Sequence, residues 1–178
     1  CSIKHKSLFP ILRKYFYQHL KEYLEKFVKN RTFHEQDNIE KKQEVFLPSD
    51  FQFLGTKLGT SDPDIKMALN YLFNRGITEA DLWFYGIGLS QKDQNWGGRI
   101  IFPSFDKKGD INFFVGRGMD QYLFPKYKNC EADKNEIIFN ELKIDMKKEI
   151  TIVEGPFDMI KSGQNSVPIL GSSLSEDS

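Results

Sequence analysis

Ile-Thr-Ile-Val-Glu-Gly-Pro-Phe-Asp is the sequence of residues 150–158, and its character changes at Glu154. The β-branched run predicts a short strand, the Gly-Pro pair predicts a tight turn, and residues 157–162 predict a helix. A glutamate at the carboxyl end of a buried strand in an α/β sheet faces the crevice where such sheets bind ligands, and Asp158 follows one helical turn later. We therefore expect the two carboxylates to converge on one spot.

Two carboxylates in such a place suit a hard divalent cation. Mg²⁺ takes oxygen ligands and keeps several waters, which leaves room for substrate phosphates. The pair Glu154 and Asp158 therefore favours phosphoryl-transfer chemistry. Two structural roles stay open on the residues alone: Glu154 could stabilise the positive end of the following helix, and Asp158 could form a salt bridge with Lys161.

Further strands are predicted on both sides of this stretch. The apolar run 167–170 predicts a strand that completes a β-α-β unit with residues 151–153. Upstream, the runs 99–103 and 111–115 predict a hairpin around the turn 107–110. Four phenylalanines are expected in the core rather than as base-stacking platforms: Phe102, Phe113, Phe114 and Phe139. Three aromatic residues in loop-like contexts are better stacking candidates: Trp96, Tyr122 and Tyr127.

Helices are predicted before the hairpin. Ser61-Asp62-Pro63 supplies a cap and a first-turn proline for a helix that Gly76 ends, and residues 78–81 have the form of a capping box. Apolar residues between 8 and 27 recur at helical spacing, and the opposite face of that helix is basic. Residues 32–48 are polar and lack periodicity, so we interpret them as a linker or mobile loop.

Composition restricts the class of protein. The chain has 178 residues and a formal net charge of zero, with 25 basic and 25 acidic residues. Its only cysteines are Cys1 and Cys130, and no segment has the length and apolarity of a membrane span or the pattern of a signal peptide. We therefore expect a globular protein of a reducing, cytoplasmic setting without membrane contact. Because the chain begins at Cys1 and stops soon after the run 167–170, we also expect a fragment cut at both ends.

Three basic residues stand where a phosphate can reach them. Arg99 follows two glycines, Arg117 has a glycine on each side, and Lys126 lies in a Phe-Pro-Lys-Tyr stretch. Glycine lets a polyanion approach the backbone closely. Arginine offers a planar fork and lysine a compact charge, so the set suits triphosphate or nucleic-acid binding, although each could also be an ordinary solvated charge.

The succession of these motifs resembles the RNA polymerase core of DnaG-type primases, which contains a TOPRIM domain. The resemblance covers about residues 65–178 and rests on the segments 74–78, 85–88, 98–103, 115–117, 125–127, 134–140, 154–158 and 170–172. Proline in the Glu-Gly-Pro-x-Asp motif, and a helix directly after Cys1, are closer to the primases of T-even bacteriophages and their relatives. By the same resemblance, Cys1 is similar to the last ligand of an N-terminal zinc ribbon, whose Zn²⁺ would belong to the missing part.

The resemblance implies an α/β fold with three parts. Residues 1–48 would be a helical region and linker after the zinc ribbon, and residues 49–148 a mixed α+β basic subdomain. Residues 149–178 would be the truncated first part of the TOPRIM domain, which contains the β-α-β unit.

The implied activity is synthesis of short RNA primers on single-stranded DNA from ribonucleoside triphosphates during DNA replication. By motif, Glu154 would be the catalytic acid and metal ligand and Asp158 a second ligand for Mg²⁺ or Mn²⁺. Arg99, Arg117, Lys126 and Lys134 would contact nucleotide phosphates and the RNA–DNA hybrid. In the family a later Asp-x-Asp pair completes the metal site, and the chain ends before any such pair, so we expect these residues alone to be inactive.

Partners implied by the resemblance are the template, the hybrid, ribonucleoside triphosphates and a replicative helicase, in the cytoplasm of a phage-infected bacterium. Two other classes stay open. A TOPRIM nuclease or topoisomerase-like enzyme would share the glutamate-bearing strand without needing Arg99, Arg117 and the Pro-Lys-Tyr stretch. A non-catalytic nucleic-acid-binding module would bind its template without Mg²⁺ and survive the loss of Glu154.

Overall fold

The computed structural model describes residues 44–133, 137–163 and 165–170. All of them belong to the second of two compact units, residues 1–42 and 43–178. The predicted basic helix between residues 8 and 27, Cys1 and Lys134 lie outside the described residues, as does the end of the 170–172 motif.

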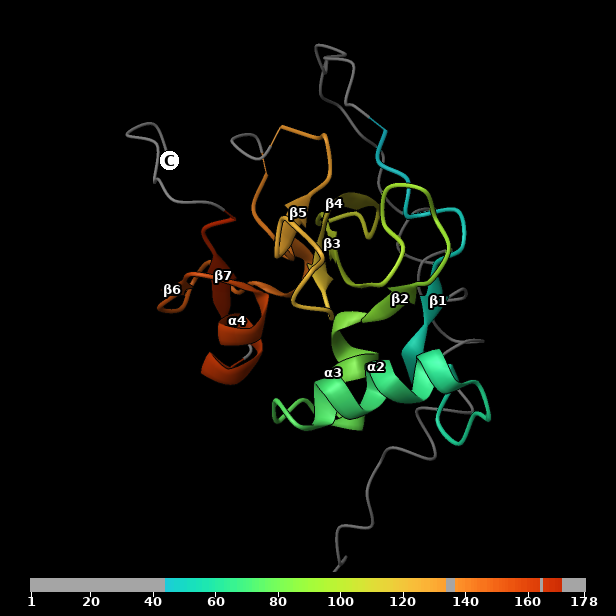
Figure 1. Ribbon diagram of the computed structural model, residues 1–178. Coiled ribbons are helices and arrows are strands. Elements are labelled where there is room, and N and C mark those ends of the chain that lie inside the picture. The colour runs from blue at the N-terminus through green and yellow to red at the C-terminus, as the bar shows by residue number, and fades with distance from the viewer. Residues whose placement is uncertain (1–43, 134–136, 164, 171–178) are drawn as a thin grey trace, which may run out of the picture. The chain divides into compact units, whose positions relative to one another are not determined.

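A five-stranded antiparallel sheet forms the larger part of the described structure (Figure 1). Its long central hairpin confirms the prediction from residues 99–115, and both of its strands extend beyond the predicted ends. The three other strands are too short for a period-two pattern and were not predicted. In spatial order the strands are β1 (Gln52–Phe53), β2 (Gly88–Ser90), β3 (Arg99–Phe105), β4 (Ile111–Gly118) and β5 (Tyr127–Asn129).

Helices α2 (Pro63–Phe73) and α3 (Glu79–Tyr85) begin where the caps predict. The Asp62 carboxylate accepts hydrogen bonds from two N–H groups of the first turn of α2, and Thr78 and Asp81 form both bonds of the capping box. The apolar side chains of these helices share one buried cluster with the sheet residues Ile100, Phe102, Phe113 and Val115. All four phenylalanines predicted in the core are at most 3% exposed.

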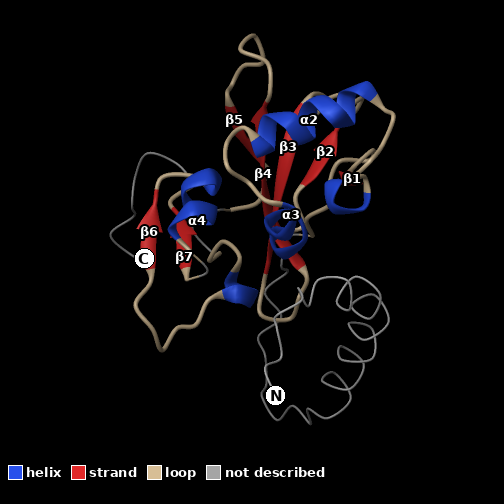
Figure 2. Ribbon diagram, turned by 90° about the horizontal axis from the view of Figure 1, so that it is seen from below, coloured by secondary structure: helices blue, strands red, loops and turns tan. Residues whose placement is uncertain are grey.

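The C-terminal part is the predicted β-α-β unit, made of β6 (Thr151–Val153), α4 (Pro156–Ser162) and β7 (Ser166–Pro168) (Figure 2). Its two strands pair in parallel. The ring of Phe157 in α4 packs edge-on against that of Phe102 in β3, with 5.2 Å between their centroids, so α4 joins the core of the larger sheet.

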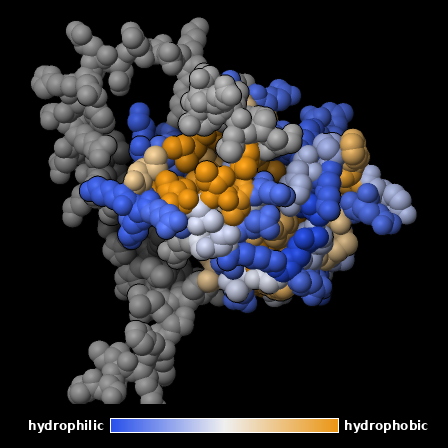
Figure 3. Space-filling model, turned by 90° about the vertical axis from the view of Figure 1, so that its left-hand side faces the viewer, coloured by the Kyte–Doolittle hydropathy of each residue, from blue (hydrophilic) through white to orange (hydrophobic). Residues whose placement is uncertain are grey.

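One part of the prediction for this unit is wrong: β6 is not a buried strand. The Ile152 side chain is 60% exposed, and β6 has a single partner strand in the described structure. Figure 3 looks onto the side of the molecule that carries β6, α4 and β7 and shows an apolar area at this surface.

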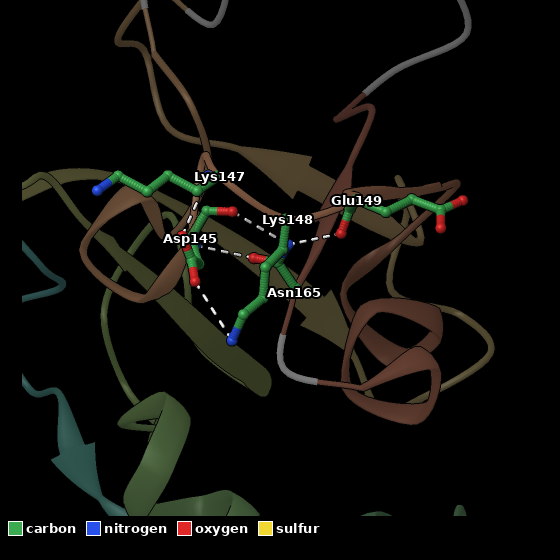
Figure 4. Close-up of polar contacts among 5 residues, drawn as sticks. All are labelled: Asp145, Lys147, Lys148, Glu149 and Asn165. Carbon is green, nitrogen blue, oxygen red and sulfur yellow. Dashed lines mark hydrogen bonds and ion pairs between the residues drawn. The ribbon is translucent and has the colours of Figure 1, made fainter.

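Asn165 ties the β-α-β unit to the loop before it (Figure 4). Its Oδ1 accepts a hydrogen bond from the Asp145 N–H at 2.8 Å, and its Nδ2 donates to the carbonyl oxygens of Glu149 at 2.6 Å and Asp145 at 3.3 Å. The next residue, Ser166, donates from Oγ to the Met159 and Gly163 carbonyls at the end of α4. These bonds fix where β7 begins and hold α4 across the two strands.

The described structure is therefore a mixed α/β fold with three α-helices, which confirms the predicted class. Among the described residues, no helix has the length and apolar character that crossing a membrane requires.

Candidate active site

A pocket of about 970 Å³ brings four of the six predicted site residues together. Glu154 and Asp158 come from the β-α-β unit, Arg117 comes from β4, and Lys126 precedes β5. The fifth, Arg99, lies elsewhere, and the sixth, Lys134, is outside the described residues. The pocket therefore joins the predicted metal carboxylates to predicted phosphate-binding cations from the other sheet.

The carboxylate side of this pocket consists of Glu154 and Asp158, both exposed. Gly155 is the N-cap of α4, and no side chain makes a capping hydrogen bond to that helix. Lys161 lines the same pocket, yet no described residue forms an ion pair with either carboxylate. In the described part, Glu154 makes no capping hydrogen bond and Asp158 forms no salt bridge with Lys161, so both carboxylates are available to a ligand.

The cationic side of this pocket consists of Arg75, Arg117 and Lys126. Arg117 is only 5% exposed, its Nε donates to the Tyr71 hydroxyl oxygen at 3.0 Å, and its Cζ lies 4.5 Å from the centroid of the Tyr127 ring. A guanidinium held by one hydrogen bond and one cation–π contact has a fixed orientation. Lys126, by contrast, is exposed.

Arg75 was not predicted as a site residue, although it lies in the 74–78 motif. Its Cζ is 4.8 Å from the Tyr71 ring centroid and 5.0 Å from that of Phe157. Tyr71 lies in the last turn of α2, and Arg75 follows the C-cap Asn74, so the two are separated by four residues, about one helical turn. That spacing, together with the adjacent helix-ending Gly76, is the signal in the sequence that could have identified Arg75.

Tyr127 connects the two sides of the pocket. It is the first residue of β5 rather than a loop residue, and it stacks on Arg117 instead of standing free as a base-stacking platform. Burial raises the pKa of its hydroxyl. The positive charges of Arg117 and Arg75 lower that pKa, whereas Tyr71 and Asp158 raise it further. A Cβ placed on Gly155 would be 3.8 Å from both the Tyr127 hydroxyl oxygen and Asp158 Oδ2, so the two sides approach each other closely at this glycine.

A hydrogen bond also joins the ends of the two sheets beside the pocket. Asn129 of β5 donates from Nδ2 to the Leu170 carbonyl at 2.7 Å, just beyond β7. Leu170 has a positive φ of 52°, which is uncommon outside glycine and marks a strained backbone position. Both residues line the pocket, so this contact fixes its rim.

Arg99 does not reach the carboxylates. In the antiparallel register Arg117 pairs with Ile100, so Arg99 projects from the opposite face of the sheet. It is 3% exposed and donates from Nη1 to the Pro125 carbonyl at 2.8 Å and from Nη2 to the Phe124 carbonyl at 3.4 Å. Burial lowers the pKa of its guanidinium. In this structure Arg99 anchors the loop before β5.

The donor set of the carboxylate side fits Mg²⁺. Within the ranges that the structure describes, no three or more His, Cys, Asp or Glu side chains gather into a metal-binding group. Mg²⁺ in phosphoryl-transfer sites commonly takes one or two carboxylates and keeps its other positions for water and substrate phosphate oxygens. Two exposed carboxylates facing cations across a pocket match that requirement.

The fold has known counterparts among DNA primases. The chain superimposes on a DnaG primase catalytic domain bound to ssDNA with a TM-score of 0.56 and 22% identity, over 70% of this chain and 53% of that one. A DNA primase domain from Pseudomonas aeruginosa gives a TM-score of 0.54 and 24% identity, over 68% of this chain and 52% of that one. The described region thus shares its fold with about half of a primase catalytic domain.

Sequence comparison agrees with the fold. A DNA primase of Clostridium acetobutylicum is 33% identical over 138 residues, covering 67% of this chain and 22% of that protein. One from Listeria innocua is 32% identical over 127 residues, covering 61% of this chain and 20% of that protein. No family model matches. The chain is therefore homologous to the catalytic, RNA polymerase domain of DnaG-type DNA primases, and it spans about a fifth of the length of these curated relatives.

Proposed function

We propose that this chain is part of the RNA polymerase domain of a DNA primase and takes part in making short RNA primers on single-stranded DNA. The observation that carries the proposal is the pocket in which Glu154 and Asp158 face Arg117 and Lys126. Homology to primases supports the assignment of that pocket to nucleotidyl transfer. In domain terms, residues 49–148 would be the basic subdomain and residues 149–178 the first part of the TOPRIM domain.

The residues of the pocket would have two separate roles, metal binding and phosphate binding. Glu154 and Asp158 would hold Mg²⁺ or Mn²⁺, which when bound supplies Lewis acidity and charge neutralisation at the triphosphate. Arg117 and Arg75 would orient phosphate oxygens from fixed positions, and Lys126 would add a point charge at the rim. Positioning and charge neutralisation supply most of the catalysis in phosphoryl transfer, and both would be features of this pocket.

Arg99 and Lys134 have different places in this proposal. Arg99 would act on nucleic acid indirectly, by anchoring the loop that carries Lys126, because its guanidinium is bonded to that loop. Lys134 would be a further phosphate contact, on the family resemblance alone. The full protein would also engage a replicative helicase and carry Zn²⁺ in an N-terminal ribbon, and Pro156 in the Glu-Gly-Pro-x-Asp motif would place it near the primases of T-even phages.

A TOPRIM nuclease or topoisomerase-like enzyme is the second candidate. The exposed carboxylates on the β-α-β unit favour any TOPRIM chemistry, and nicking needs the same metal ligands. The fixed Arg117 and the adjacent Arg75 favour the primase, since a triphosphate carries more charge to neutralise than a phosphodiester.

The proposal is tested with the full-length gene product. Labelled ribonucleotides, Mg²⁺ and single-stranded DNA are incubated with the wild type, Glu154→Gln and, as a matched control, Glu149→Gln. Glu149 is exposed, and its contact with Asn165 uses its backbone carbonyl. Short RNA made by the wild type and the control, but not by Glu154→Gln, would support a primase. Metal-dependent nicking without RNA synthesis would favour the nuclease. Template binding that is the same with and without Mg²⁺, and the same in Glu154→Gln, would favour a non-catalytic binding module.

A further inference from the structure

A smaller hollow of about 350 Å³ lies across the edge strand β5 from the carboxylate pocket. Tyr127 and Asn129 of β5 line the carboxylate pocket, whereas Lys128 between them lines the smaller hollow. Successive side chains of a strand point to opposite faces, so β5 separates the two sites. The wall of the smaller hollow includes Arg99 and Phe124.

Two aromatic side chains of loop 119–126, which joins β4 to β5, are almost fully exposed. Phe124 is 91% exposed and Tyr122 is 84% exposed, more than any other large hydrophobic residue in the described ranges. Such rings are ordinarily buried, and exposed ones are common where a partner provides the missing contact. Neither ring is in contact with another described ring, whereas Trp96 packs on Phe114 and Tyr127 on Arg117.

The loop that carries these rings is firmly held. The buried Arg99 donates to the carbonyls of Phe124 and Pro125, and the Gly118 N–H donates to the Lys126 carbonyl at 3.0 Å. Asp120 Oδ1 accepts from the Tyr122 N–H at 2.8 Å. A charged, buried side chain engaged with two loop carbonyls indicates that the position of this loop is fixed by the fold. The two rings are thus presented to solvent by an ordered backbone.

The charges around the rings favour a polyanion. The exposed Lys126 follows Phe124 by two residues, whereas Lys128 Nζ donates to the Asn95 carbonyl at 3.1 Å. The acidic residues nearby have engaged carboxylates: Asp120 accepts from the loop turn, and Asp93 accepts from Ser49 and Asn95. Phe124 and Lys126 are two residues apart, so their Cα atoms are separated by at most about 8 Å. A chain of phosphates that passes Lys126 would therefore bring a base within reach of Phe124, and Tyr122 precedes Phe124 by two residues. Exposed aromatic rings beside lysines are the pattern of single-strand binding, in which bases stack on rings regardless of sequence.

We propose that Phe124 and Tyr122 form a base-stacking platform that holds single-stranded nucleic acid at the edge of β5, next to the carboxylate pocket. The inference rests on the proposed function, which supplies the single strand, and it adds a binding site that neither the metal nor the triphosphate uses. Arg99 is then a positioning residue for the platform.

Stacking is tested by fluorescence anisotropy with labelled oligothymidylate and with an abasic oligonucleotide of the same length. Phe124→Leu and Tyr122→Leu keep apolar bulk but lose the ring, and Phe124→Trp enlarges it. Met146→Leu is the matched control, because Met146 is 54% exposed in the turn before β6, outside loop 119–126. Since both target side chains are exposed, the melting temperatures of all variants should match the wild type.

Each Leu variant is expected to bind oligothymidylate about 5- to 10-fold more weakly. Phe124→Trp should bind at least as tightly as the wild type. The abasic strand should bind all variants equally, because it has no bases to stack. The slope of affinity with salt should not change, since no phosphate contact is lost.

Two results would overturn the platform: Leu variants that bind oligothymidylate as the wild type does, or an equal loss on the abasic strand. Different results would contradict the proposed function: a wild-type protein that does not bind single strands, or a full-length protein that makes no RNA. One outcome would reject the platform alone and retain the proposed function. In it, Lys126→Ala lowers the salt slope, whereas Phe124→Leu and Tyr122→Leu change neither the slope nor the affinity for oligothymidylate.

Discussion

The cationic and carboxylate sides of the pocket are built in opposite ways. Arg117 is 5% exposed, belongs to a strand of the five-stranded sheet, and is oriented by Tyr71 and Tyr127. Glu154 lies in the two-residue connection between β6 and α4, and Asp158 lies in the first turn of α4. Both are exposed, beside a two-stranded sheet whose Ile152 is 60% exposed. Arg117 is thus fixed when the protein folds, whereas no contact in the described part of the chain fixes the two carboxylates. Substitutions on the two sides should therefore separate stability from activity.

The largest effect is expected on the carboxylate side. Glu154→Gln should lower RNA synthesis by the full-length protein by at least about 100-fold, because it removes a metal ligand while keeping the shape. The melting temperature should not change, since the exposed Glu154 has no structural partner in the described part of the chain. A fall of several degrees would contradict the contrast between the two sides.

Substitution of Arg117 should affect both stability and binding. Arg117→Ala should lower the free energy of unfolding by about 2–3 kcal/mol, because it removes buried packing and the hydrogen bond to Tyr71. Triphosphate affinity should fall by about 10- to 100-fold. Arg117→Lys should recover much of the stability but little of the affinity, since lysine lacks the planar fork. Denaturant unfolding and calorimetric titration measure the two quantities, and an Arg117→Ala protein of unchanged stability would refute the proposed anchoring.

Tyr71→Phe isolates the orientation of Arg117 from its charge. The ring contact with Arg75 remains and only the hydroxyl that accepts from Nε is lost. We expect a loss of about 1 kcal/mol in stability and about a 3- to 5-fold loss in triphosphate affinity. Tyr85→Phe, a buried tyrosine elsewhere, is the control for loss of a hydroxyl. Equal triphosphate affinities in Tyr71→Phe and the wild type would show that Tyr71 does not position Arg117.

Lys126 tests the exposed end of the cationic side. Lys126→Ala should leave stability unchanged and weaken single-strand binding about 3- to 5-fold at low salt. The slope of log affinity against log salt should fall by about 0.7, the value for one phosphate contact on a single strand. An unchanged slope would mean that Lys126 is merely solvated.

The segment between the two sheets contains a partly buried lysine, Lys143, whose titration should make stability depend on pH. Lys143 Nζ lies 4.1 Å from the Phe84 ring centroid, and burial lowers the pKa of Lys143 from 10.5 to about 8. Between these values the unfolded chain holds a proton that the native state has released, so stability should rise with pH across that window. Relative to Lys143→Met, the wild type should gain about 1 kcal/mol from pH 8 to pH 10.5. The exposed Lys147→Met should show no such trend, and a constant difference for Lys143→Met would reject the burial effect.

Sequence patterns predicted the elements that have local causes. The caps at Asp62 and Thr78, the long hairpin and the strand-turn-helix around Glu154 are all specified by neighbouring residues, and each was found as expected. The short strands β1, β2 and β5 were not predicted because two or three residues carry no periodicity and form only against a partner strand.

The site was only partly predicted, because the residues that meet in it depend on the register of the hairpin strands. Arg99 and Arg117 have similar sequence contexts, but the hairpin pairs Arg117 with Ile100, and a one-residue difference in register sends a side chain to the other face. Nothing in the local sequence reports that register. The hydrogen bond between Arg117 and Tyr71 joins residues 46 positions apart. It forms only once α2 lies beside the sheet, so local sequence patterns could not predict it.

The central claim is that the carboxylates and the cations of this pocket act on one ligand, a metal-bound triphosphate. Calorimetric titration of a ribonucleoside triphosphate into the chain, with and without Mg²⁺, tests it for the wild type and Glu154→Gln. We predict that Mg²⁺ strengthens binding to the wild type by about 10-fold or more. Glu154→Gln should lose that gain and keep the metal-free affinity, which depends on Arg117. A variant with the same gain from Mg²⁺ as the wild type would contradict the claim.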